Sequence, residues 1–165
     1  MQKIFLDLNQ AVESENIRRL KDGTLTVPKS EVLILGQMSL MLNESVSKIL
    51  NLIQTGDMDA KLEMDHFTKS KMVEFLAAKG LVFDDDSHLV WIPKDAKTIS
   101  WLKLKHIDVY LIDAESVLLS KAVHAPQKNR QLIRQAIASG HFPELIERII
   151  LNGGKLELFL ESDHE

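Results

Sequence analysis

The sequence contains no cysteine among its 165 residues. This absence excludes disulfide bonds, thiol nucleophiles and cysteine-ligated zinc. The six histidines show neither the His-x-x-x-His nor the His-Glu-x-x-His spacing, so we expect no zinc site. There is no Walker loop or dinucleotide-binding fingerprint either, since Gly153 and Gly154 lack the preceding strand that such loops need.

Aromatic residues, basic charge and long apolar runs are also scarce. Aromatic residues make up 5% of the chain, which argues against a platform for stacking single-stranded bases. The net charge of −4, from 20 basic and 24 acidic residues, provides no global basic field for nucleic acid. The longest apolar run, residues 32–42, is too short to cross a bilayer, and the N-terminus lacks the apolar stretch of a secretory signal. We therefore expect a cytoplasmic protein that does not enter a membrane.

Length and periodicity predict one domain, residues 1–165, of the α+β class. Apolar spacing predicts a strand at 31–35, two strands at 98–104 and 107–112, and a hairpin with an acidic turn at 81–92. Helices are predicted at 4–20, 38–53, 68–79, 113–124, 127–139 and 143–151, with residues 43–45 either interrupting the second helix or beginning another. The Asp113 side chain can cap the helix at 113–124. This order predicts a small mixed sheet flanked by helices, with a helical C-terminal third.

Two carboxylates, Asp57 and Asp59, follow a small turn at the start of an apolar alternation over residues 57–64. If these residues form a strand, both acids lie on one face, and Met58, Ala60 and Leu62 lie on the other. Two acids so placed repel each other unless both are solvated or a divalent cation lies between them. The pair therefore indicates either a solvated turn that begins a strand or a metal site.

Basic side chains gather in the two helices predicted at 113–124 and 127–139. They are Lys121, His124, Lys128, Arg130 and Arg134. They could bind a triphosphate or RNA phosphates, with Arg130 and Arg134 on one helical face, or they could form a solvated face. A second basic stretch, at residues 94–106, is more typical of an exposed strand edge protected by lysines.

Four segments in order resemble a known family. They are Leu-Ile-Leu-Gly-Gln-Met-Ser-Leu at 33–40, Thr-Gly-Asp-Met-Asp at 55–59, a strand, cap and Ser-Lys helix at 109–121, and Lys-Asn-Arg-Gln-Leu-Ile-Arg at 128–134. Together they resemble the minimal nucleotidyltransferase-like proteins of prokaryotes, which are related to those of toxin–antitoxin and abortive-infection systems. The resemblance covers residues 30–150, and its specificity lies in the order and spacing of the four segments.

The resemblance implies a nucleotidyltransferase-like mixed sheet and a Mg²⁺-dependent transfer of a nucleotidyl group from a nucleoside triphosphate to a hydroxyl of RNA or protein. Asp57 and Asp59 would be the catalytic residues that hold Mg²⁺, which neutralises triphosphate charge and activates the hydroxyl. A glycine pair in the family lets the backbone approach the phosphates. The substrate-binding residues implied are Gly36, Gln37, Lys121 and Arg130.

Some positions depart from the family pattern. Gln37 replaces the second small residue, and Asn129 and Leu132 stand where acids are expected. The family's third carboxylate has no clear counterpart; by position alone the candidates are Asp65, Asp86 and Asp108. These departures support an alternative function, a catalytically degenerate binding module such as one component of a toxin–antitoxin pair.

Overall fold

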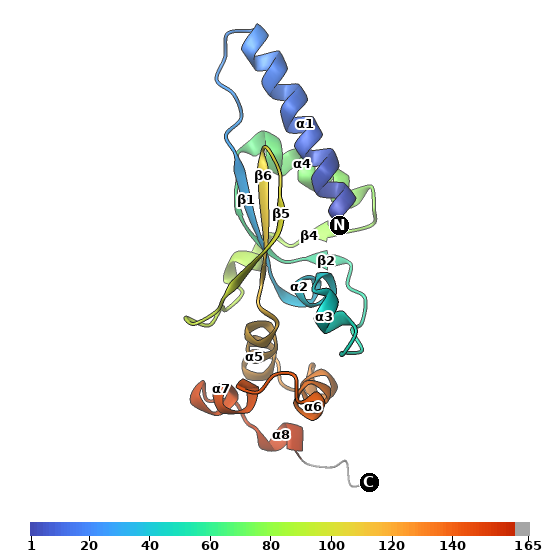
Figure 1. Cartoon of the computed structure of the whole chain (residues 1–165), viewed down its shortest axis with the longest axis vertical. Coiled ribbons are helices and arrows are strands. Elements are labelled where there is room, and N and C mark those ends of the chain that lie inside the picture. Colours follow the sequence, from blue (N-terminus) through green and yellow to red (C-terminus); the bar gives the residue numbers. More distant parts are fainter. Residues whose placement is uncertain (161–165) are drawn as a thin grey trace. The chain divides into compact units, whose positions relative to one another are not determined.

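The computed structural model describes residues 1–160 and confirms an α+β fold with a mixed sheet (Figure 1). These residues form two compact units. The first unit comprises Met1–Met38, Thr55–Val90 and Thr98–Leu111. The second comprises Ser39–Gln54, Trp91–Lys97 and the described residues from Ile112 onward.

The first unit is built on a four-stranded sheet with the order β3-β1-β6-β5. The strands are β1 (Ser30–Ile34), β3 (Ala60–Glu63), β5 (Thr98–Lys103) and β6 (Ile107–Ile112). Strand β1 runs antiparallel to β3 and parallel to β6, which makes the sheet mixed. At one end of β1, Ile34 pairs with Ala60 and Leu111. The residues that follow β1 therefore lie beside those that precede β3.

The two faces of this sheet differ in burial. On β1, Val32 and Ile34 are buried, whereas Glu31 is exposed and Leu33 is half-buried. Helix α1 (Gln2–Lys21) buries Ile4, Phe5, Leu8 and Val12, and Phe5 makes an edge-on ring contact with Trp101 of β5 at 6.2 Å. Helix α4 (His66–Ala77) packs against α1. The alternation is that of a sheet with one face in the core and one face open.

The second unit is helical. Helix α2 (Gly36–Leu42) passes from the first unit into it, and the remaining helices are α3 (Glu44–Ser47), α5 (Ala114–His124), α6 (Arg130–Ser139), α7 (Leu145–Leu151) and α8 (Glu157–Leu160). The break at residue 43 is thus an interruption between two helices. As expected from the sequence, Asp113 caps α5, because its carboxylate accepts a hydrogen bond from the Ser116 N–H at 2.9 Å. The core of this unit includes Leu118, Ile133 and Ile149.

The hairpin predicted at residues 81–92 is wrong. Strand β4 (Val82–Phe83) is followed by the 3₁₀ helix η1 (Asp85–Leu89) and not by a returning strand. The Asp84 carboxylate accepts from the Asp86 N–H at 2.9 Å, which caps the first turn of η1. The Ser87 hydroxyl then donates to the Ala60 carbonyl at 2.9 Å. These local side-chain bonds favour a helical turn over a strand.

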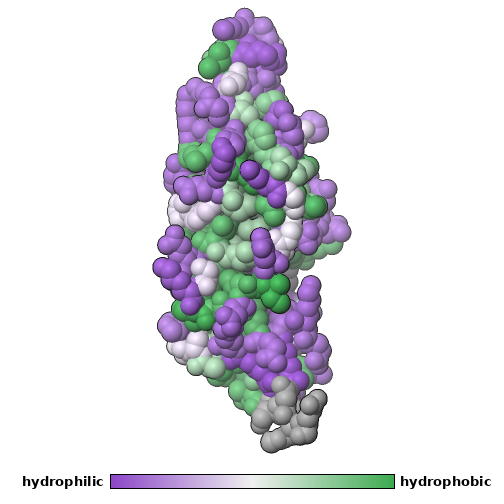
Figure 2. All heavy atoms as spheres, turned by 90° about the vertical axis from the view of Figure 1, so that its right-hand side faces the viewer, coloured by the Kyte–Doolittle hydropathy of each residue, from purple (hydrophilic) through white to green (hydrophobic). Residues whose placement is uncertain are grey.

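Apolar side chains are also exposed on both units. The most exposed include Leu25, Ile53 and Leu151. On the face shown in Figure 2, hydrophobic residues lie between hydrophilic ones. Since apolar atoms normally supply more than half of a protein surface, these residues by themselves indicate no function. Within residues 1–160, no helix has the combination of length and apolarity that a membrane crossing requires.

The burial of α1 can be tested with two leucines of the same helix. Leu8 is fully buried, whereas Leu6 is 47% exposed. We expect Leu8→Ala to lower the free energy of unfolding by about 2–5 kcal/mol, through lost burial and a cavity. The matched control, Leu6→Ala, should cost about 1 kcal/mol or less. Urea unfolding followed by circular dichroism measures both, and equal losses would contradict the packing of α1 described above.

Candidate functional site

The segment with the two carboxylates changes sheets in its middle. Strand β2 (Asp57–Met58) pairs in parallel with β4, whereas β3 begins at Ala60 and pairs with β1. The continuous strand predicted at 57–64 is therefore divided at Asp59. The predicted alternation is confirmed: Met58 and Ala60 are 0% and 3% exposed, Asp57 is exposed and Asp59 is half-buried.

The Asp59 carboxylate lies against the turn that follows β1. The Leu35 N–H donates to the Asp59 carbonyl at 2.8 Å, which joins the end of β1 to the sheet change. Gly36 has φ +57°, and a Cβ placed on it would lie 2.5 Å from Oδ2 of Asp59. Glycine is therefore required here both by the left-handed backbone and by the approach of the carboxylate. Sequence positions 36 and 59, predicted to act together, are adjacent in the fold.

Asp57 and Asp59 provide the kind of ligand that a Mg²⁺ site needs. Carboxylate oxygens are the protein ligands that Mg²⁺ prefers, and Mg²⁺ commonly keeps several waters and binds through one or two carboxylates and substrate phosphates. Asp57 and Asp59 fit that small donor set. The Asp57 N–H donates to the Thr55 hydroxyl at 3.2 Å, so the preceding turn is also ordered by its own side chain. The same geometry is compatible with a turn that only begins a strand.

In the described part of the chain, no third carboxylate joins the pair as a metal ligand. Among residues 1–160, no three His, Asp or Glu side chains are grouped so that they could hold a metal ion. Of the three candidates, Asp65 caps α4 by accepting from the N–H and hydroxyl of Thr68, at 2.9 and 2.7 Å. Asp86 is an exposed residue of η1. Neither is grouped with Asp57 and Asp59 as a metal ligand.

The third candidate, Asp108, lies in register with Glu31, near the opposite end of β1 from Gly36. It is 7% exposed and forms ion pairs with Lys29 at 2.9 Å and Lys103 at 3.1 Å. Burial by itself would raise the pKa of Asp108, but hydrogen bonds from Lys29 and Lys103 outweigh it and hold the pKa below its ordinary value. Asp108 is therefore an ionised member of a structural charge cluster.

The remaining predicted site residues lie on α2, α5 and α6. Gln37 is half-buried in the first turn of α2. In the second unit, the Lys121 ammonium donates to the Asn129 side chain at 3.3 Å, and the Arg130 Nε donates to the Leu158 carbonyl at 2.8 Å. Both basic residues thus help to hold this unit together. Their contact with phosphate stays a prediction.

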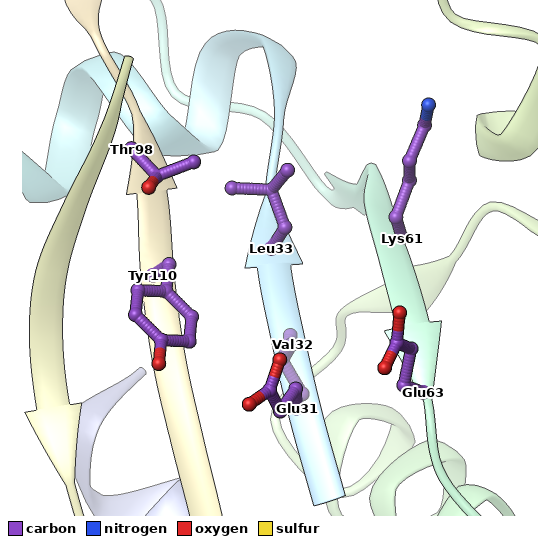
Figure 3. A pocket seen from close by; sticks show the side chains of 7 residues that line it. All are labelled: Glu31, Val32, Leu33, Lys61, Glu63, Thr98 and Tyr110. Carbon is purple, nitrogen blue, oxygen red and sulfur yellow. The ribbon is translucent and has the colours of Figure 1, made fainter.

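The sequence reasoning missed the side chains on the open face of the sheet. A hollow of about 390 Å³ lies there, lined by Glu31, Val32, Leu33, Lys61, Glu63, Thr98 and Tyr110 (Figure 3). The alternation that predicts Asp57 and Asp59 on one face continues to Lys61 and Glu63, and this signal could have found them. The residues that lie beside Lys61 and Glu63 on β1 depend on the pairing of the strands, which the sequence pattern does not predict.

The contact between Gly36 and Asp59 can be tested with two glycines of similar backbone. Gly23 has φ +67° and open space where a Cβ would lie, so Gly23→Ala should cost only the backbone strain, about 1–2 kcal/mol. Gly36→Ala should cost at least about 1 kcal/mol more, because its methyl group overlaps the Asp59 carboxylate. Urea unfolding measures both variants. Adding Asp59→Ala to Gly36→Ala should recover part of the loss; equal costs and no coupling would contradict the contact.

Comparisons of the sequence with protein-family models and with curated proteins find no match, and no solved structure matches it either. The function is therefore argued from the site's geometry and from the order of the sequence motifs. The feature that both share is the position of the Asp59 carboxylate beside the Gly36 turn.

Proposed function

We propose that this chain is a cytoplasmic, nucleotidyltransferase-like domain that binds a nucleoside triphosphate with Mg²⁺ and transfers its nucleotidyl group to a hydroxyl of RNA or protein. One observation carries the proposal: the Asp59 carboxylate lies against the glycine turn that ends β1. A strand-ending glycine and a pair of acids, far apart in the sequence, are thereby adjacent. This is the juxtaposition that metal-assisted binding of a phosphate chain requires.

Each residue has a separate task in this proposal. Asp57 and Asp59 would hold Mg²⁺, which when bound neutralises phosphate charge and promotes attack by the acceptor hydroxyl. Gly36, which carries no side chain, would let the Asp59 carboxylate come close to the turn that faces the phosphates. Gln37, Lys121 and Arg130 are proposed as further substrate contacts, on the resemblance alone.

A second function is favoured by the missing third carboxylate. Asp65 and Asp108 are engaged in a helix cap and in ion pairs, so neither is offered as a third ligand beside Asp57 and Asp59. A site with two acids can still bind a metal–nucleotide complex, but it has fewer groups to stabilise transfer. The second candidate is therefore a catalytically degenerate binding module, for example one component of a toxin–antitoxin pair.

Nucleotide binding tests both candidates. We expect isothermal titration calorimetry to detect Mg²⁺-dependent binding of ATP, GTP or CTP to the unaltered chain. Asp57→Ala combined with Asp59→Ala should weaken binding by at least about tenfold, or about 1.4 kcal/mol. A control with the same change in charge is Asp7→Ala combined with Asp22→Ala, two exposed acids paired with Lys3 and Arg18. This control should bind like the unaltered chain.

An α-labelled nucleotide then separates the two functions. Transfer of label onto RNA or protein, abolished by the Asp57→Ala and Asp59→Ala changes, would support the transferase. Binding without transfer to any acceptor tried would support the degenerate module. If none of the three nucleotides binds in the presence of Mg²⁺, both forms of the proposal are contradicted.

A further inference from the structure

The open face of the sheet carries a hollow of about 390 Å³ whose lining comes from four neighbouring strands (Figure 3). Glu31 and Leu33 come from β1, Lys61 and Glu63 from β3, and Tyr110 from β6. This volume lies within the range of about 300–1,000 Å³ that is typical of ligand sites. The hollow is thus large enough to receive a side chain or a small ligand.

Two glutamates lie next to each other in the lining of the hollow (Figure 3). Glu31 and Glu63 are direct partners in the antiparallel pairing of β1 with β3, and both are exposed. Neither side chain forms a hydrogen bond or an ion pair with the part of the chain that the structure describes. Like charges directly opposite each other on a sheet are destabilising. A cation placed between the two carboxylates would relieve this repulsion.

The nearby cations do not neutralise this pair. Lys29 and Lys103 form ion pairs with Asp108, on the other side of Glu31. Lys61 is two residues from Glu63 on the same strand, but Figure 3 shows its side chain directed away from Glu63. Negative charge at the Glu31 and Glu63 end of the hollow therefore remains without a partner in this unit.

The rest of the hollow is apolar enough to bind an alkyl chain. Leu33 lies between Lys61 and Tyr110 in the register of the sheet, and both Leu33 and Tyr110 are half-buried. The Lys103 ammonium donates a hydrogen bond to the Tyr110 hydroxyl and lies 4.4 Å from the centre of the Tyr110 ring, which leaves Leu33 as the main apolar surface of the hollow. An arginine side chain combines an apolar stem with a planar guanidinium that binds carboxylates through paired hydrogen bonds.

We propose that this open face is a docking site for an arginine-containing segment of a partner protein. The guanidinium binds between Glu31 and Glu63, and the stem lies over Leu33. Charge complementarity selects this occupant, because the two carboxylates repel the phosphates of nucleic acid. The inference goes beyond nucleotide binding and stands whether or not Asp57 and Asp59 hold a metal.

Amide chemical shifts of the full ¹⁵N-labelled chain test the proposal by titration with a capped Gly-Leu-Arg-Leu-Gly peptide. We expect shifts to concentrate at residues 30–34, 60–63 and 107–111, which lie in three of the four strands around the hollow. The same peptide with citrulline in place of arginine has nearly the same shape but no charge. It should bind at least about tenfold more weakly, since it cannot form charge-assisted bonds to the carboxylates.

Substitutions of the lining residues complete the experiment. Glu31→Gln combined with Glu63→Gln should weaken the arginine peptide at least about tenfold, and Glu63→Gln alone serves if the double variant does not give a folded spectrum. Lys61→Gln, on the same face, should leave the affinity unchanged or increase it. The proposal is overturned if the citrulline peptide binds equally well, if the glutamine variants bind normally, or if no shifts occur on these strands. Shifts of these residues on adding a single-stranded RNA oligonucleotide would also overturn it.

Discussion

The contact between the Asp59 carboxylate and the Gly36 turn is the constraint on which both proposed sites depend. It joins the end of β1 to the point where the chain leaves β2 and begins β3, with the Leu35 N–H bonded to the Asp59 carbonyl. From this point Ile34 pairs with Ala60, and the antiparallel register then places Glu31 opposite Glu63. Two pairs of carboxylates thus lie near the two ends of β1. Asp57 and Asp59 lie near the end that is followed by Gly36, and Glu31 and Glu63 lie near the other end.

The two pairs have different surroundings and hence different chemistry. The Asp59 carboxylate lies against the Gly36 turn, and Asp57 is two residues away on the chain, which suits the proposed binding of a hydrated metal ion and phosphates. Glu31 and Glu63 lie beside Leu33 and Tyr110, which suits a cation with an apolar stem. Asp108 belongs to neither pair, since Lys29 and Lys103 neutralise it. In the two proposals, the nucleotide and the partner protein would therefore bind near opposite ends of β1.

Local patterns in the sequence predicted much of this fold. Period-2 burial around Met58 and the capping of α5 by Asp113 follow from neighbouring residues, and both are confirmed. The 3₁₀ helix that replaces the predicted hairpin depends partly on a bond from Ser87 to Ala60, which are distant in the sequence. The opposition of Glu31 and Glu63 likewise depends on strand pairing. Side chains that meet only through the fold were the ones that sequence patterns could not place.

The central claim is that Asp57 and Asp59 hold a divalent cation beside the Gly36 turn. The most direct test is a crystal structure of the chain with Mn²⁺ and a nucleoside triphosphate, in which anomalous scattering locates the metal. The account predicts a Mn²⁺ peak about 2.1 Å from a carboxylate oxygen of Asp57 or Asp59, with the phosphates next to Gly36. A metal located only at the acidic turn of residues 84–86, or nucleotide bound away from Gly36, would contradict it.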